Sequence, residues 1–189
     1  MLERRSRTKF GFELKRYSMS DHSPSETVPN ADAIGPVLGR TPSGVFILTA
    51  SSGDGQETGM LASWVQQASF DPPAITVAVN SKRYINNWLQ QSPQIALNLV
   101  GESQSVFLKH FGRGFEPDQP AFEGLSTSKA ANGATVLDDA LGYLAGEVTA
   151  KMKAGDHVIY QVQITAAGSG DKLESEKPMV HIRKNGFNY

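Results

Sequence analysis

Short runs of alternating side chains, each ended by turn-forming residues, dominate the chain from Ile34 onward. In residues 74–79, Ile and Val side chains occupy every second position and smaller side chains occupy the positions between them. This two-residue period is typical of a β-strand whose two faces differ. Comparable runs occupy residues 45–48, 60–68, 94–100, 147–152, 157–165 and 179–183. Short strands with few helices between them predict a mainly β antiparallel barrel or sandwich, and they argue against a parallel doubly wound sheet.

The spacing of apolar residues also predicts which side chains face inward. Alternation places Val148, Ala150 and Met152 on the inward face of their strand.

Two segments have the spacing of helices instead of strands. Residues 84–91 and 102–111 carry apolar stripes at helical spacing, so we expect a short helix in each. These helices are short compared with the strands, and the expected fold class stays mainly β.

Two segments depart from this pattern. Residues 1–33 begin with a basic segment and continue into a stretch rich in Ser and Pro, so we expect a flexible arm followed by one folded domain, residues 34–189. The arm is either a solvated tail or a docking segment for an acidic partner. Residues 112–134 are rich in Gly, Pro and Asp, and a loop of this length inside a compact domain is usually functional.

The composition excludes several classes of function. No cysteine is present, which excludes disulfides, thiolate metal sites and cysteine nucleophiles. The formal net charge of -1 argues against a nucleic-acid partner. No apolar run approaches the roughly 20 residues of a membrane-spanning helix, and the four histidines fall in separate elements, so neither a membrane span nor a metal site is expected. The absence of cysteine makes a cytoplasmic protein the expectation, and Arg4-Arg5 precedes charged rather than apolar residues, which argues against an export signal.

Polar side chains are frequent in residues 60–70, where a barrel strand is expected. Ser63, Gln67 and Ser69 alternate there with small residues and with Trp64. Small side chains let a flat ring approach the strand, whose backbone groups can then bond the edge of a heterocycle. The alternative is a sheet edge with one wet face. Trp64 accordingly has two interpretations, contact with a ligand or dimer partner and plain packing.

A second polar group lies at the end of the next expected strand. Ser81, Lys82 and Arg83 come directly before the expected helix. Free backbone N–H groups and the helix dipole would favour an anion such as phosphate, and the two cations add charge-assisted donors. The alternative is a serine cap beside two solvated cations. Taken with the polar strand, this junction indicates a mononucleotide cofactor that lies along the barrel.

Two histidines are candidates for the same site. His157 begins a strand, on the face opposite the bulky row, and is either directed outward into a cleft or held locally in its turn. His110 lies at the end of a helix and either caps that helix or faces the anion. Each histidine thus has a ligand-facing interpretation and a structural one.

Several motifs, in this order and spacing, resemble the flavin reductase-like family of FMN-binding split barrels. The similarity is greatest to the C-terminal flavin reductase module of cyanobacterial flavodiiron (diflavin) proteins, and it runs from about residue 34 to residue 189. The residues that carry it are Met60-Leu61-Ala62-Ser63-Trp64-Val65, Gln67-Ala68-Ser69-Phe70, Pro72-Pro73, Leu108-Lys109-His110-Phe111, Asn132-Gly133, Leu141-Gly142-Tyr143-Leu144, Gly155-Asp156-His157 and His181-Ile182-Arg183-Lys184-Asn185-Gly186-Phe187-Asn188-Tyr189.

The resemblance implies a fold, a cofactor and a set of site residues. The fold would be a six-stranded antiparallel Greek-key split barrel that works as a homodimer, binds FMN or less often FAD, and oxidises NADH or NADPH. The implied contacts to the flavin ring and ribityl chain are Ala62, Ser63, Trp64, Gln67 and Ser69. The implied phosphate turn is Ser81, Lys82 and Arg83, and Phe111 lies on the segment that would close over the site. His157 would lie near the flavin and the nicotinamide, where we expect it to orient a ring rather than abstract a proton.

The function that the resemblance implies is the transfer of a hydride from NAD(P)H to FMN. Reduced flavin or electrons would pass to a separate oxygenase or redox protein. This sequence departs from the diflavin proteins in having no metallo-β-lactamase-like or flavodoxin module, which leaves the identity of the electron acceptor open. Two alternatives stay open. One is a non-catalytic FMN-binding protein of the same fold, and the other is a split barrel that binds heme or pyridoxal phosphate, since one barrel hosts many functions.

Overall fold

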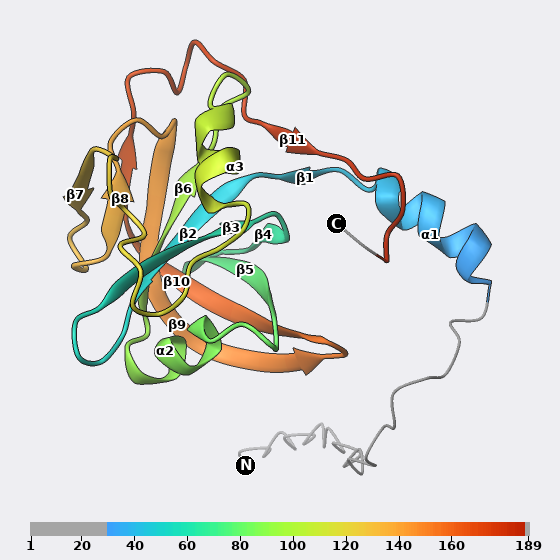
Figure 1. Cartoon of the computed structure of the whole chain (residues 1–189), viewed down its shortest axis with the longest axis horizontal. Helices are drawn as coiled ribbons and strands as arrows, with labels where there is room; N and C mark the ends of the chain where they lie inside the picture. Colours follow the sequence, from blue (N-terminus) through green and yellow to red (C-terminus); the bar gives the residue numbers. More distant parts are fainter. Residues whose placement is uncertain (1–29, 188–189) are drawn as a thin grey trace, which may run out of the picture.

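Seven strands pair into one antiparallel sheet, which curls into a barrel (Figure 1). They are β2 (Phe46–Ser51), β3 (Glu57–Ala62), β4 (Val65–Phe70), β5 (Pro73–Asn80), β6 (Gln94–Leu99), β9 (Gly142–Ala154) and β10 (His157–Ser169). Their order across the sheet is β3-β2-β6-β9-β10-β5-β4. The structure, a computed structural model, describes residues 30–187.

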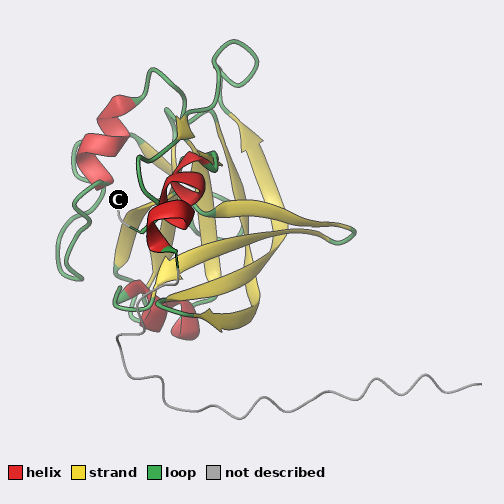
Figure 2. Cartoon of the chain, turned by 90° about the vertical axis from the view of Figure 1, so that its right-hand side faces the viewer, coloured by secondary structure: helices red, strands yellow, loops and turns green. Residues whose placement is uncertain are grey.

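Helices and two short strand pairs surround this barrel (Figure 2). The helices are α1 (Ala31–Arg40), α2 (Ile85–Gln91) and α3 (Ser105–Phe111), and the short strands are β1 (Ser43–Gly44), β7 (Thr127–Lys129), β8 (Thr135–Leu137) and β11 (Val180–His181). Strand β1 pairs with β11, and β7 pairs with β8. In the described part of the chain, no helix is long and apolar enough to cross a membrane.

The strand expected over residues 60–68 is divided into β3 and β4 by a sharp corner at Ser63 and Trp64. These two strands lie at opposite ends of the sheet order although they follow each other in the chain. The Ala78 amide of β5 donates to the Trp64 carbonyl oxygen at 3.0 Å, which holds the corner against the far side of the sheet. The antiparallel barrel predicted from the sequence is therefore confirmed, and its sheet has seven strands where the family resemblance implied six.

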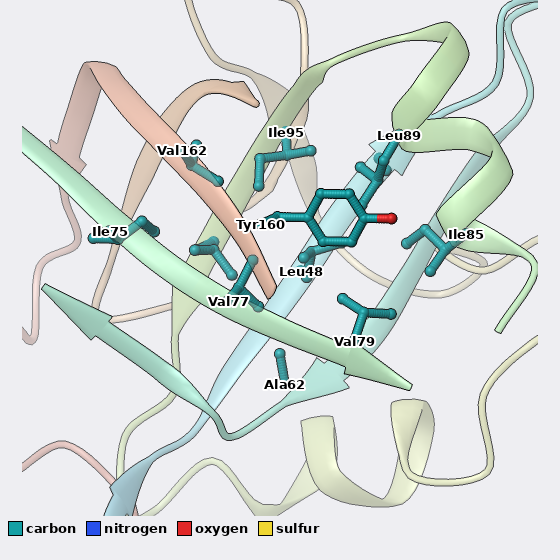
Figure 3. Packing of buried hydrophobic residues seen from close by; sticks show 12 residues of the cluster. Leu48, Ala62, Ile75, Val77, Val79, Ile85, Leu89, Ile95, Tyr160 and Val162 are labelled. Atoms are coloured by element: carbon teal, nitrogen blue, oxygen red, sulfur yellow. The ribbon is translucent and has the colours of Figure 1, made fainter. Parts of the chain in front are cut away.

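Aliphatic side chains around one buried tyrosine fill the barrel (Figure 3). On β5, Val77 and Val79 are fully buried and Ile75 nearly so, as their alternation predicts. Tyr160 of β10 lies among them with 1% of its surface exposed and its hydroxyl directed toward α2. Burial of apolar surface contributes about 25 cal/mol per Å², so this cluster is a main source of the barrel's stability.

The expected inward face of β9 is only partly correct. Val148 is half-buried and pairs with the core residue Val162, whereas Ala150 and Met152 are exposed. A register shift between these pairs leaves Thr149 as an extra residue in β9. Because such a bulge moves the following side chains to the other face, Met152 lies outside the barrel with 60% of its surface exposed.

Helix α1 packs against residues 183–186, a segment named here the C-terminal strap (Figure 1). The amides of Arg183 and Gly186 each donate to a carbonyl oxygen of α1, those of Gly39 and Gly35, at 2.7 Å. The helix begins at Ala31, inside the arm predicted for residues 1–33, and residues 1–29 of that arm lie outside the described residues. Both ends of the described chain therefore meet in one unit beside the barrel.

Candidate functional site

A cavity of about 390 Å³ opens between the barrel and α3. Its walls come from Val45 before β2, β3, the corner after β3, β5, the turn before α2, α3 with the loop after it, the first residue of β10 and the last residue of β11. Most of the lining is apolar, with a few polar groups from Ser63, Asn80, Arg83, His157 and His181. An apolar cavity with a few convergent polar groups is typical of a small-molecule site.

The cavity gathers half of the site residues expected from the sequence. Ala62, Ser63, Arg83, Phe111 and His157 all line it. The other five lie elsewhere: Trp64 lines two neighbouring surface grooves, Ser81 and Lys82 are exposed on the turn before α2, and Gln67 and Ser69 lie on β4 away from the cavity.

Phe111 owes its position to a glycine on β3. A Cβ atom on Gly59 would lie 2.6 Å from Cε1 of the Phe111 ring, which is closer than any real contact. The absence of a side chain at Gly59 therefore lets the ring lie directly on β3. Phe111 is 1% exposed and also contacts the rings of Phe115 and Phe122, so the loop after α3 is tied to the cavity wall.

Arg83 reaches from the turn before α2 to the loop after α3. A Cβ atom on Gly114 would lie 2.7 Å from Nη1 of Arg83, and Gly114 has a φ of +75°. Glycine is thus required there both for the backbone conformation and for the close approach of the guanidinium. This contact brings a permanent positive charge to the cavity wall.

The backbone amides of the turn are already used within the protein. The Ser81 amide donates to the Asp156 carbonyl oxygen, the Lys82 amide to Oδ1 of Asn80, and the Arg83 amide to the Asn80 carbonyl oxygen. The Ser81 hydroxyl also donates to the Asp156 carbonyl oxygen, at 2.8 Å. The expectation of free N–H groups is therefore wrong at these three positions, and the cationic groups of this turn are the Lys82 and Arg83 side chains.

Asn86 of α2 binds this turn through its side-chain amide. The sequence patterns did not identify this residue. Its Nδ2 donates to the carbonyl oxygens of Asn80 at 2.9 Å and Arg83 at 2.7 Å. Its Oδ1 accepts a hydrogen bond of 2.8 Å from the Tyr160 hydroxyl. The side chain is 8% exposed, and its position directly after Ile85 on the buried side of α2 is the only sequence signal for it.

His157 combines the two roles that the sequence left open for it. It lines the cavity, and its Nδ1 lies 2.8 Å from Oδ1 of Asp156 in the same turn. The side chain is buried, with 6% of the residue exposed. The hydrogen bond to His157 is the main cause of a lowered pKa for the Asp156 carboxyl, which therefore stays ionised. The Trp64 ring lies against His157 at 4.6 Å between centroids, tilted by 41°.

The other two described histidines differ from the expectations. His110 bonds through Nε2 to the Ala121 carbonyl oxygen at 2.8 Å, so it anchors the loop after α3 instead of capping its helix or facing an anion. His181, which carried no usable sequence signal, lines the cavity from β11. Burial lowers the pKa of the His181 imidazole, and the positive charge of Arg183 lowers it further.

Comparisons with known proteins bear on this site. A family model described as "Flavin reductase like domain" matches residues 38–188. Diflavin flavoprotein A 1 of Synechocystis sp. is 40% identical over 154 residues, which are 80% of this chain and 26% of that protein. The chain thus spans about a quarter of the length of this curated relative.

Solved structures show the same fold at lower identity. The NADH:FAD oxidoreductase SgcE6 of Streptomyces globisporus matches with a TM-score of 0.71 and 21% identity, over 82% of this chain and 89% of that one. The same oxidoreductase has been solved in complex with NAD and FAD fragments, and that structure matches with a TM-score of 0.68, 20% identity and coverage of 80% and 86%. The styrene monooxygenase flavin reductase of Pseudomonas putida matches with a TM-score of 0.66 and 24% identity, over 78% of this chain and 90% of that one.

The family resemblance read from the motifs is confirmed by these matches. The family model extends over most of the chain, from the end of α1 through the barrel to the C-terminal strap. This protein therefore belongs to the flavin reductase like domain family.

Proposed function

We propose that this protein is a flavin reductase that transfers a hydride from NADH or NADPH to FMN, with FAD as a second flavin. The observation that carries the proposal is one cavity on which residues from separate elements converge: the Ala62-Ser63 corner, Arg83, Phe111 and His157. Membership of the flavin reductase like domain family supports the same conclusion. The SgcE6 complex with NAD and FAD fragments is consistent with binding of both nucleotides by this fold.

The size and the lining of the cavity support a flavin mononucleotide as its ligand. Its volume of about 390 Å³ lies within the range of small-molecule sites. The small side chains of Ala62 and Ala78 let a flat ring approach the backbone, and Phe111 supplies an aromatic wall. Arg83 would hold the phosphate, with Lys82 on the same turn adding a second cation. Trp64, Gln67, Ser69 and Ser81 remain predicted contacts from positions outside the cavity wall.

The proposed reaction depends on positioning more than on acid–base catalysis. A bound flavin would supply the hydride-accepting chemistry. The protein's part is to hold two rings at reacting distance and to exclude water from between them. Because the Asp156 carboxylate can only accept, Nδ1 of His157 carries a proton, and Nε2 is the ring nitrogen left for a ligand. His157 would thereby orient an amide or imide edge of a bound ring.

A homodimer is proposed as the working form. Large apolar side chains stand exposed on the outside of the barrel, among them Phe70 at 87% and Met152 at 60% of their surface. Exposed groups of this kind often mark contact surfaces. Light scattering during size-exclusion chromatography measures the molar mass in solution. The mass of a single chain at micromolar concentration would exclude the dimer.

A separate oxygenase or redox protein is proposed as the electron acceptor. The name of the styrene monooxygenase flavin reductase suggests an oxygenase as the acceptor for that protein.

The deciding experiment combines a visible spectrum with a nucleotide assay. The purified protein is titrated with FMN and with FAD, and oxidation of NADH and of NADPH is followed with and without flavin. Steady oxidation that requires added or bound flavin supports the proposal. Tight FMN binding without NAD(P)H oxidation would instead identify a flavin-binding protein of the same fold. Heme or pyridoxal phosphate bands in the spectrum would reject both.

A further inference from the structure

The imidazole ring of His157 has two neighbours in the structure. Its Nδ1 atom bonds to the Asp156 carboxylate, and the ring contacts the indole ring of Trp64. The acidic partner, Asp156, is 81% exposed, and a hydrogen bond to a solvated carboxylate fixes one ring atom only weakly. The contact with Trp64, at 4.6 Å between ring centroids, restricts rotation of the imidazole plane. Trp64 is therefore one of the groups that bear on the orientation of His157 toward the cavity.

Trp64 is in turn contacted from the C-terminal end of the chain. The Cζ atom of Arg183 lies 5.3 Å from the centroid of the Trp64 ring, within the range of a cation–π interaction. Trp64 and Arg183 also line the same small groove, whereas neither belongs to the cavity wall. Arg183 thus touches the ring that supports His157 without facing the cavity itself.

Arg183 has a defined position because α1 and the C-terminal strap fix its backbone. Its amide donates to the Gly39 carbonyl oxygen at 2.7 Å, and its Nη1 donates to the Gly186 carbonyl oxygen at 3.3 Å. A Cβ atom on Gly39 would lie 2.8 Å from the Arg183 carbonyl oxygen, so α1 and the strap are in direct backbone contact. Figure 1 shows this unit beside the barrel, joined to it through β1 and β11.

We propose that Arg183 is a positioning residue for the cavity, and that it acts through Trp64 on the orientation of His157. The consequence for turnover rests on the proposed function, whereas the coupling of the three side chains does not. Loss of the guanidinium removes a contact to Trp64 and loosens the imidazole. Arg83 and Phe111 line the cavity independently of this contact, and Trp64 itself lies outside the cavity wall. The nicotinamide step is therefore affected more than flavin affinity.

The coupling is tested by NMR, which needs no turnover. The imidazole resonances of His157, assigned by their loss in His157→Gln, report the ring current of Trp64. In Arg183→Ala they are expected to move toward the positions seen in Trp64→Ala, and Arg183→Lys, which keeps a cation, is expected to restore them in part. The matched control is Lys184→Ala, the neighbouring exposed cation of the strap, which should leave them in place. Unchanged His157 resonances in a folded Arg183→Ala protein would overturn the proposal.

The kinetic consequence is measured on the same variants. Arg183→Ala is expected to raise the KM for the preferred nicotinamide nucleotide about three- to tenfold, with the FMN dissociation constant within twofold of the parent. The double variant with Trp64→Ala should be no worse than Trp64→Ala alone, because both act through one contact. Fully additive losses, or an equal loss of FMN affinity, would contradict a role through Trp64. Absence of NAD(P)H oxidation in the parent protein would reject the proposed function and leave the NMR result to decide the coupling.

Discussion

The Tyr160 hydroxyl donates a hydrogen bond of 2.8 Å to Oδ1 of Asn86, which joins the centre of the barrel to the turn that carries the site's cations. Asn86 uses its other amide atom to hold the carbonyl oxygens at both ends of that turn, those of Asn80 and Arg83. Burial raises the pKa of the Tyr160 hydroxyl, so it remains a donor at physiological pH. Packing of the core and placement of Arg83 are therefore coupled through two side chains.

Replacing Tyr160 by Phe should destabilise the protein while leaving the core filled. The change leaves Oδ1 of the buried Asn86 without its donor, which costs about 1–3 kcal/mol. Urea unfolding measures the loss. Tyr143→Phe, at a tyrosine packed outside the barrel core, is the control and should change the free energy of unfolding much less. Equal stabilities of Tyr160→Phe and the parent would show that the hydrogen bond contributes nothing net.

Removing the guanidinium of Arg83 should weaken flavin binding. Charge-assisted hydrogen bonds contribute about 1.5–3 kcal/mol each, so Arg83→Ala is expected to raise the FMN dissociation constant about ten- to a hundredfold. Riboflavin, which lacks the phosphate, should bind parent and variant alike. Lys151→Ala, at an exposed lysine on β9, serves as the charge control. An unchanged FMN affinity would remove Arg83 from the phosphate site.

Alanine substitutions at two glycines with similar backbone angles distinguish the effect of backbone strain from the effect of displacing Arg83. Gly114 has φ +75° and lies against Arg83, whereas Gly133 has φ +84° and no atom within 4 Å of the place that a Cβ would take. Alanine at either position should cost about 1 kcal/mol or more in stability, because an L-residue is strained there. Only Gly114→Ala should also lower FMN affinity, since its methyl group displaces the guanidinium. Equal effects on FMN binding in both variants would argue against the contact.

Local sequence patterns predicted the barrel strands well where inward and outward side chains alternate along the whole strand without a bulge. Strand β5 is such a case, since Ile75, Val77 and Val79 are all buried as expected. The bulge at Thr149 has no comparable signal in the sequence, so the outward position of Met152 was missed. Helix α1 was missed as well, because Pro36 and two glycines are poor helix formers. Its glycines instead allow backbone contact with the C-terminal strap, a tertiary effect.

The site was predicted where its residues carry local chemistry and missed where distant segments complete it. Arg83 and His157 sit next to turn signals that can be read from neighbouring residues, and both line the cavity. His181 reaches the same cavity only because β11 pairs with β1, which no local pattern specifies. Gln67 and Ser69 lie on β4, beyond the corner that carries the chain away from the cavity wall, although they belong to the same polar run as Ser63.

His181 should make stability depend on pH in the weakly acidic range. Burial lowers its pKa below the usual value of 6.5, so the folded protein binds fewer protons at this site than the unfolded chain does. The free energy of unfolding must then fall as the pH drops through about 6.5 and on to the folded-state pKa. In urea unfolding, His181→Gln should lose less stability than the parent between about pH 7.5 and pH 5.5. Parallel curves for the two proteins over this range would contradict a lowered pKa.

Replacing His157 by Ala should impair the use of NAD(P)H and leave the fold intact. The side chain lines the cavity while its Nδ1 bonds to an exposed carboxylate, so its loss removes a ring-orienting group without exposing the core. A misplaced ring costs reaction rate because hydride transfer needs close, aligned partners, and we expect kcat/KM for NAD(P)H to fall about tenfold or more. Stopped-flow reduction of bound flavin measures this step directly. Asp156→Asn keeps a hydrogen-bonding partner for Nδ1 and should give a smaller loss. An unchanged rate of flavin reduction in His157→Ala would show that the imidazole has no part in placing the rings.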